Sequence, residues 1–379
     1  MLDAILLGLV LLCSTVYFVF LLLILGGLKK IKRGLPENRA KENPFISIIV
    51  PCRNESINIT NNITGLLAQN YPPYLYEILY IDDHSTDRMN DIISSYNDKR
   101  IRLFHLGNSP ERLTGKKHAI AYGLEYAKGE IIVATDADCA YSPNWLTTIA
   151  QNFDNETGFL SAPVAFHKKN GLFQAMQAAE FAGLVLTGAG LIGLNHPTIC
   201  NGANIAYRKS LFHQVNGFVD NHGLASGDDE LLMRKIHKLG TYKVKFAGNT
   251  DAVVYTHAAG TLVEFINQRA RWASKGLYYN NLFVLFALVP IFIFFLNLLV
   301  LPILGILYKI SFLVLFLVIF FIKTVLESII IKNGNTFLRT KIRLIEFMFT
   351  QALHPLYIVS SVLLGTFKSY TWKDRVIRH

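Results

Sequence analysis

Charge is scarce in this chain of 379 residues, and so is cysteine. Charged side chains make up 17% of the residues and hydrophobic ones 51%, a balance too apolar for an ordinary soluble protein. The cysteines form no CxxC pair and no zinc-binding spacing; they are Cys13, Cys52, Cys139 and Cys200. The sequence therefore gives no sign of a disulfide framework or a zinc site, and it favours free thiols in a reducing compartment.

A nucleic-acid-binding motif is also missing, although the formal net charge is +10 at pH 7. The basic residues gather at the edges of apolar segments, and neither a recognition helix nor an aromatic RNA-binding motif accompanies them. We therefore expect no nucleic-acid partner.

Long apolar runs are present at both ends of the chain. Residues 1–28 contain one charged residue, Asp3, and could span a bilayer core of about 30 Å as a helix. A signal peptide would carry positive charge ahead of a shorter apolar core, whereas here the basic residues follow it, in the linker 29–43. By the positive-inside rule, the N-terminus lies outside and the next domain lies in the cytoplasm. The four sequons, at Asn54, Asn58, Asn62 and Asn155, would then never meet the glycosylation machinery.

The C-terminal region, residues 281–366, contains about three apolar segments. We expect a hairpin of two spans over 281–331, broken near Pro302 and at 308–311, then a polar loop to residue 343 and a third segment interrupted by His354 and Pro355. Three spans would put the tail 367–379 outside, yet its basic residues favour the cytoplasm. Either the last segment is re-entrant or interfacial, or the count is wrong. In each case we expect a multi-pass protein of the bacterial inner membrane, with membrane lipids as partners.

Between these regions, residues 44–280 have the composition of a soluble domain. An apolar strand ends at Pro51 and leads to a helix near 57–69, and two further strand patterns, at 76–87 and 128–139, end in carboxylates. Strands that alternate with helices predict a mostly parallel, Rossmann-like α/β sheet, in which ligands bind at the carboxyl ends of the strands.

The third of these strand ends carries Asp136 and Asp138. On extended backbone, side chains two residues apart point the same way, so both carboxylates can face one ligand. Carboxylates and diphosphate oxygens are ligands that Mg²⁺ and Mn²⁺ accept. D-x-D alone is also common in surface turns, so the pattern needs support from other motifs.

That support comes from the order of the motifs along the chain. They are "VPCRNE" (50–55), "IDDHSTD" (81–87), "LTGKKHAIAYGLEYAKGE" (113–130), "TDADC" (135–139), "CNGANIAYRKSLF" (200–212), "SGDDELLMRKI" (226–236) and "QRARW" (268–272). With these motifs, residues 44–280 resemble the membrane-bound family 2 glycosyltransferases, including ceramide-glucosyltransferase-like and polysaccharide-synthase-like members. The resemblance implies a GT-A fold, a nucleotide-sugar donor, a divalent metal and inversion at the anomeric carbon.

The resemblance also implies roles for individual residues. On the donor side, Pro51, Glu55 and Asp83 would contact the nucleoside, Lys116 would lie near the diphosphate, and Asp136 and Asp138 would hold Mg²⁺ or Mn²⁺ against the donor. On the acceptor side, Asp229 falls at the catalytic base and Asp228 stands where the family commonly has Glu, while Gln268, Arg271 and Trp272 serve the acceptor and the leaving group beside Gly202 and Asn204. Helix capping is the competing interpretation for Asp228 and Asp229. An interfacial anchor is the competing interpretation for Arg271 and Trp272.

Three functions are compatible with these patterns. The first is an inverting glycosyltransferase that moves a sugar from a UDP- or GDP-sugar to a lipid or glycan acceptor, with a lipid preferred. The second is a processive polysaccharide synthase with a translocation channel, but the C-terminal segments offer few polar residues to line a sugar-filled pore. The third is a non-catalytic membrane scaffold or transporter subunit, in which loss of some motif residues would be expected.

Overall fold

The computed structural model describes residues 2–33, 43–107, 115–167, 171–219, 229–274, 282–367, 370–372 and 375–377. Its strands are β1 (Ile46–Cys52), β2 (Tyr76–Asp82), β3 (Ile101–His105), β4 (Ile131–Thr135), β5 (Ala140–Tyr141), β6 (Thr157–Ser161), β7 (Val164–Phe166), β8 (Asn204–Arg208), β9 (Lys243–Phe246), β10 (Val254–Thr256), β11 (Tyr370–Trp372) and β12 (Arg375–Ile377). Its α-helices are α1 (Leu2–Arg33), α2 (Ile59–Leu67), α3 (Met89–Ser94), α4 (Gly115–Tyr126), α5 (Trp145–Gln151), α6 (Leu172–Gly193), α7 (Lys209–Gln214), α8 (Glu230–Lys238), α9 (Leu262–Ser274), α10 (Leu282–Leu307), α11 (Ile310–Leu338) and α12 (Leu344–Phe367). Short 3-10 turns cover Pro73–Leu75 and Thr250–Ala252.

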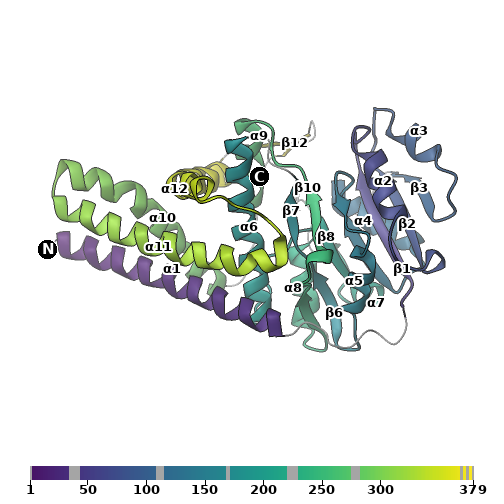
Figure 1. The fold of residues 1–379 in the computed structure, drawn as a ribbon, viewed down its shortest axis with the longest axis horizontal. Coiled ribbons are helices and arrows are strands. Elements are labelled where there is room, and N and C mark those ends of the chain that lie inside the picture. Colours follow the sequence, from purple (N-terminus) through teal and green to yellow (C-terminus); the bar gives the residue numbers. More distant parts are fainter. Residues whose placement is uncertain are drawn as a thin grey trace.

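A seven-stranded sheet forms the centre of the domain, in the order β3-β2-β1-β4-β8-β6-β9 (Figure 1). Strands β3, β2, β1 and β4 are parallel, β8 is antiparallel to both of its neighbours, and β9 is parallel to β6. Strands β1 and β2 are buried almost throughout, which explains their continuous apolar sequences. The predicted mostly parallel α/β sheet is confirmed.

The parallel strands deliver their carboxyl ends to one edge of the sheet. Cys52, the last residue of β1, pairs with Asp82, the last residue of β2, and β4 runs beside β1 in the same direction. The residues that follow these three strands therefore converge. The predicted helix over 57–69 is observed as α2 over Ile59–Leu67.

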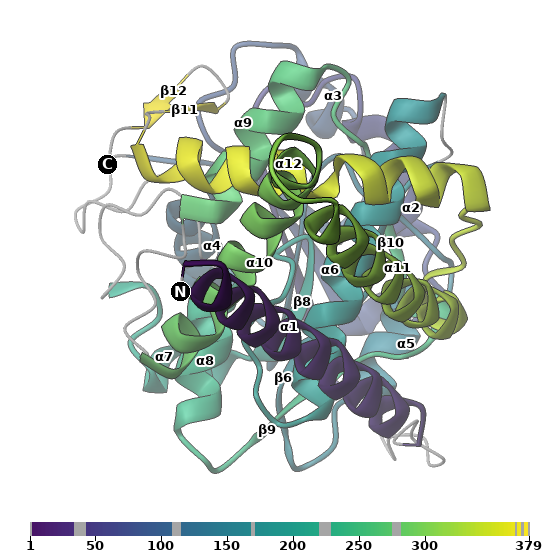
Figure 2. The same cartoon turned by 90° about the vertical axis from the view of Figure 1, so that its left-hand side faces the viewer.

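Helices α1, α10 and α11 form a bundle that extends away from the sheet, with α6 and α12 lying across it on the side of the domain (Figures 1 and 2). By length and composition, α1, α6, α10, α11 and α12 are the helices in the described part of the chain that could cross a membrane. Sequence patterns placed α6 inside the soluble domain, so its apolar character was missed.

The C-terminal helices are longer and more continuous than predicted. Helix α10 passes through Pro302 without a break, and α12 passes through Pro355. The segment expected as a polar loop from residue 331 remains helical to Leu338, because Phe337 is buried and its ring packs against Phe246 of β9 at a centroid distance of 6.3 Å. A partner in the domain thus keeps the end of α11 helical.

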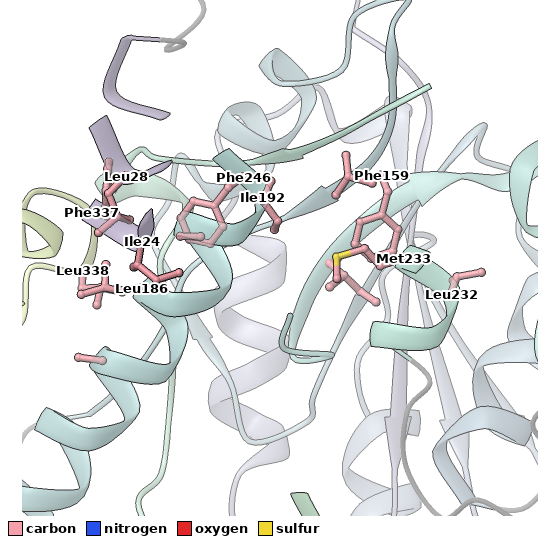
Figure 3. Packing of buried hydrophobic residues seen from close by; sticks show 14 of the residues in the cluster. Ile24, Leu28, Phe159, Leu186, Ile192, Leu232, Met233, Phe246, Phe337 and Leu338 are labelled. Atoms are coloured by element: carbon pink, nitrogen blue, oxygen red, sulfur yellow. The ribbon is translucent and has the colours of Figure 1, made fainter. Parts of the chain in front are cut away.

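Helices α1 and α6 touch backbone to backbone. A Cβ atom at Gly27 would lie 1.9 Å from the carbonyl oxygen of Gly190, and one at Gly193 would lie 2.3 Å from that of Gly27. Only glycine permits this approach. Around it, Ile24 and Leu28 of α1 join a hydrophobic core that reaches through Leu186 to Phe246 and on to β6 and α8 (Figure 3). The bundle and the domain therefore share one core.

Candidate active site

A cavity of about 400 Å³ opens at the carboxyl edge of the sheet. Eleven of the thirteen predicted site residues line it: Pro51, Glu55, Asp83, Lys116, Asp136, Asp138, Gly202, Asp229, Gln268, Arg271 and Trp272. They come from the ends of β1, β2 and β4, the starts of α4 and α8, the segment before β8, and α9. The fold thus gathers motifs that are far apart in the sequence around one space.

Two predicted residues stand apart from this group. Asn204 is fully buried at the start of β8, where its side-chain amide donates to the carbonyl oxygens of Pro163 and Ala252, both at 2.8 Å, and accepts from the Trp145 indole at 3.1 Å. These bonds use both ends of the amide to join three segments, so the prediction that Asn204 faces the acceptor is corrected to a structural role. Asp228 lies outside the described residues.

The D-x-D segment is held in place by Asn62 of α2. This amide donates to the carbonyl oxygens of Asp136 at 3.1 Å and Cys139 at 3.2 Å, and its oxygen accepts from the Tyr80 hydroxyl at 2.8 Å. Its side chain is buried, with the residue 1% exposed, so the sequon at this position is inaccessible in the folded protein. From the sequence Asn62 was recognised only as a sequon, because no local pattern reveals its contacts.

The two aspartates of the motif have different neighbours. Asp136 forms an ion pair with Lys116, whose Nζ lies 2.5 Å from Oδ1 and also donates to the carbonyl oxygen of Gly202 at 3.0 Å. Asp138 accepts a hydrogen bond from the Thr256 hydroxyl at 2.8 Å. Lys116 therefore places a positive charge beside the carboxylates, at a position suited to a diphosphate.

The donor set fits a hard divalent cation. Among the described residues, no group of three His, Cys, Asp or Glu side chains is arranged to hold a metal, so the protein offers two carboxylates and leaves the other positions to ligand and water oxygens. Mg²⁺ and Mn²⁺ are bound in this way with phosphate-containing substrates. His257 also lines the cavity, next to Thr256, although its spacing in the sequence suggests no ligand pair.

The ends of β1 and β2 are joined around the predicted nucleoside site. Arg53 donates through Nη1 to the carbonyl oxygen of Asp83 at 2.8 Å, and the Asp83 backbone N–H donates to the carbonyl oxygen of Cys52 at 2.9 Å. Glu55, on the same side of the cavity, accepts from the Asn58 amide at 2.8 Å. These contacts fix the backbone from which the carboxylates of Asp83 and Glu55 face the cavity.

Asp229 caps helix α8 and lines the cavity at the same time. Its Oδ1 accepts from the backbone N–H of Glu230 and its Oδ2 from that of Gly202, both at 2.8 Å, and the residue is 7% exposed. A carboxylate has about four lone-pair sites, and these two hydrogen bonds use one site on each oxygen. The helix-capping interpretation and the cavity position therefore coexist.

Helix α9 presents Gln268, Arg271 and Trp272 on one face, because residues three and four apart are neighbours on a helix. All three line the cavity, and the Trp272 ring packs against Phe181 of α6 at a centroid distance of 5.9 Å. The exposed apolar residues of α9 lie instead in its first turn, at Leu262 and Val263. This arrangement favours an active-site role for the motif over a membrane anchor.

The remaining wall of the cavity is apolar and comes from α6. Its lining residues on this helix are Phe181, Leu184, Val185, Gly188 and Ala189. The same helix contacts α1, α11 and α12. The cavity is therefore polar at the sheet edge and apolar toward the bundle.

Residues 47–215 match the profile of the family described as "Glycosyl transferase family 2". The chain carries a family 2 glycosyltransferase domain. It is 26% identical over 269 residues to "Probable glycosyltransferase YdaM" of Bacillus subtilis (strain 168), a match that covers 65% of this chain and 59% of that protein. A second relative, "Beta-monoglucosyldiacylglycerol synthase" of Nostoc sp., is 33% identical over 113 residues, which are 30% of this chain and 24% of that protein.

A similar fold occurs in a solved structure. The mannosyltransferase PcManGT from Pyrobaculum calidifontis, in complex with GDP-Man and Mn²⁺, has a TM-score of 0.56 and 17% identity, and the alignment covers 95% of this chain and 99% of that one. The predicted GT-A fold with flanking apolar helices is confirmed.

Proposed function

We propose that this protein transfers one sugar from a UDP- or GDP-sugar to a lipid acceptor at the cytoplasmic face of the membrane, with inversion at the anomeric carbon. The observation that carries the proposal is the position of α6: one helix supplies the apolar wall of the cavity and also packs against the membrane bundle. A lipid could therefore reach the polar edge of the cavity with its hydroxyl while its apolar part follows α6. The relative named as a glucosyldiacylglycerol synthase supports this acceptor class.

The residues of the cavity suit a single displacement. The acceptor oxygen forms a bond to the anomeric carbon, the bond from that carbon to the diphosphate oxygen breaks, and the acceptor proton passes to Asp229. Lys116 and Arg271 place positive charge where the nucleotide diphosphate departs, and the planar fork of Arg271 matches phosphate geometry. Asp136 and Asp138 would hold Mg²⁺ or Mn²⁺, which would neutralise part of the diphosphate charge.

The acceptor side would be formed by Trp272 and Phe181. Their rings pack at 5.9 Å where the polar part of the cavity meets its apolar wall. An aromatic surface can stack on an acceptor and exclude water from the reacting atoms. Exclusion of water matters because water would otherwise compete as the acceptor.

The arrangement of the helices supports a topology that removes the conflict over the C-terminal tail. In α12, Gln351 donates to Glu327 of α11 at 2.6 Å, so α12 crosses α11 at that point. The part of α11 beyond the crossing, residues 310–327, would be about 26 Å long, close to the thickness of a bilayer core. Helices α1, α10 and α11 would then span the membrane, and α12 would lie in its cytoplasmic interface.

The surface of α12 supports an interfacial position. Its exposed large apolar residues recur at helical spacing and are Leu344, Ile345, Met348, Phe349, Leu353, Leu356 and Leu363. Such a stripe suits a helix that lies in the plane of the membrane with one face toward lipid. With three spans and an in-plane α12, the tail 367–379 returns to the cytoplasmic side, as its basic residues favour.

The proposal is tested by the product. The full chain in nanodiscs is incubated with Mn²⁺, a panel of UDP- and GDP-sugars and each of three lipids, namely diacylglycerol, ceramide and a polyprenyl phosphate, and the lipids are analysed by mass spectrometry. We expect a mass increase of one sugar on one lipid class. NMR of the product should show a β-glycosidic bond when the donor sugar is α-linked. Oligosaccharide chains instead of a single addition would identify a processive synthase, and unchanged lipids across the panel would refute the lipid acceptor.

A further inference from the structure

Arg269 belongs to the "QRARW" segment but does not line the cavity. Its guanidinium makes several contacts with neighbouring side chains. Its side chain is 5% exposed, and it forms an ion pair with Glu180 of α6, whose side chain is 9% exposed. Both ends of the guanidinium participate: Nε donates to Glu180 Oε1 at 3.2 Å, and Nη2 donates to Oε2. A buried charge pair of this kind joins α9 to α6 with defined geometry.

The same guanidinium contacts two residues that line the cavity. Its Nη1 donates to the side-chain oxygen of Gln268 at 2.5 Å, and its Cζ lies 4.3 Å from the centre of the Trp272 ring. Phe265 lies on the same side of α9, with its ring centre 4.5 Å from Cζ. The orientation of both Gln268 and Trp272 is thus coupled to the position of Arg269.

The partner of Arg269 stands next to a cavity residue as well. Glu180 precedes Phe181, and the Phe181 ring packs on Trp272. The α6–α9 contact therefore has a charged half, Glu180 with Arg269, and an aromatic half, Phe181 with Trp272. Both halves use adjacent residues of α6, Glu180 and Phe181.

Helix α9 also packs closely against α12. A Cβ atom at Gly365 of α12 would lie 2.5 Å from the carbonyl oxygen of Ala270, and the ring of Tyr357 in α12 packs against Phe265 at a centroid distance of 5.5 Å. Helices α6 and α12 therefore both hold α9, and the bond from Glu180 is a charged contact on the α6 side.

We propose that Glu180 and Arg269 form a positioning pair that holds Trp272 and Gln268 in the orientation required to bind the acceptor. This inference rests on the proposed function for its kinetic consequence. Neither residue contacts the reacting atoms; the pair acts through Trp272. The predicted donor contacts at the ends of β1, β2 and β4 lie on other elements than this pair.

The test begins with Glu180→Gln in the full chain in nanodiscs. The amide keeps the shape but removes the charge that faces Arg269. We expect the KM for the acceptor to rise at least about tenfold, which corresponds to about 1.4 kcal/mol of binding free energy, while the nucleotide-sugar affinity and kcat change little. Glu77→Gln is the matched control: Glu77 is a buried carboxylate paired with Arg102 at 3.1 Å in the same domain, away from the cavity, and its loss should leave the acceptor KM unchanged.

A double variant separates positioning from stability. Glu180→Gln with Arg269→Gln removes both charges, so no unpaired buried charge remains and thermal stability should recover relative to the single variant. The acceptor KM should stay high because the guanidinium on Trp272 is lost. An acceptor KM that recovers together with stability would overturn the proposal.

A spectroscopic measurement tests the pair without any transfer reaction. The chain has three tryptophans, and subtracting the emission of Trp272→Phe isolates the signal of Trp272. We expect acrylamide to quench this signal more in Glu180→Gln than in the native chain or in Glu77→Gln, and equal quenching would refute the positioning role. If the native chain glycosylates no lipid, the proposed function fails, and the quenching result still decides on the pair.

Discussion

Replacing Asp229 by Asn separates the chemical role of this residue from its structural one. The side chain accepts two backbone hydrogen bonds, from Gly202 and Glu230, on two different oxygens. An asparagine has one acceptor oxygen and one NH₂ group, so one of the two N–H donors must face another donor. Asp229→Asn is therefore not a silent structural change, and its cost has to be estimated before its kinetics are interpreted.

The two effects differ in size. One buried donor without a partner destabilises the fold by about 1–3 kcal/mol, and a protein with roughly 5–15 kcal/mol of stability would still be more than about nine-tenths folded. Loss of a general base lowers turnover by about 10²–10⁴ fold, which corresponds to about 3–5 kcal/mol in the activation free energy. Partial unfolding cannot account for a loss of that size.

Asp87→Asn provides the control. Asp87 also accepts two backbone N–H bonds on separate oxygens, from Ser56 at 2.8 Å and from Met89 at 3.2 Å, and it does not line the cavity. We expect both variants to lose thermal stability, and only Asp229→Asn to lose turnover, measured as nucleotide release with saturating acceptor. The affinity for the nucleotide sugar, measured by calorimetry, should stay within about threefold of the native value in both variants. Neither carboxylate belongs to the residues predicted to bind the nucleotide sugar. Turnover near the native level in Asp229→Asn would assign the base to another residue.

Three further predictions address the metal, the leaving group and the topology. Asp138→Ala, or EDTA with the native chain, should abolish turnover, and Mn²⁺ should restore only the native chain; full activity in chelator would exclude a required metal. Arg271→Lys keeps the charge but loses the planar fork, so turnover should fall at least about tenfold, whereas a membrane anchor would tolerate the exchange. A cysteine introduced at Ile57, which is 90% exposed, should react with an impermeant maleimide in inside-out vesicles and not in intact cells. Labelling in intact cells would show that the domain lies on the outer side and would contradict the predicted topology.

Local patterns were sufficient to predict the sheet and eleven of the residues that line the cavity. Asp136 and Asp138 follow an apolar strand, and Gln268, Arg271 and Trp272 share one face of a helix, so periodicity and motif order carry the information. Asn204 shows the limit of this approach. It lies two residues from Gly202 in the same motif, but it begins a strand that pairs with β4, and its amide turns into the domain.

Non-local packing explains the features that were missed. Helix α6 is rich in alanine and glycine, a composition that suits a soluble domain as well as an apolar helix, and nothing in its sequence names α1 as its partner. The direction of α12 depends on Gln351 meeting Glu327 of another helix. The contact between Glu180 and Arg269 likewise joins two helices whose proximity exists only after the bundle and the sheet have come together.

The glycine contact between α1 and α6 has a consequence for biosynthesis. Gly27 leaves the ribosome long before Gly190 and Gly193, so α1 lacks this partner while most of the sheet is made. The back of the apolar cavity wall is therefore covered only when α6 packs against α1. A chain produced without α1 would fold with that surface of α6 uncovered, so supplying α1 as a separate segment should recover more active protein than any change of detergent.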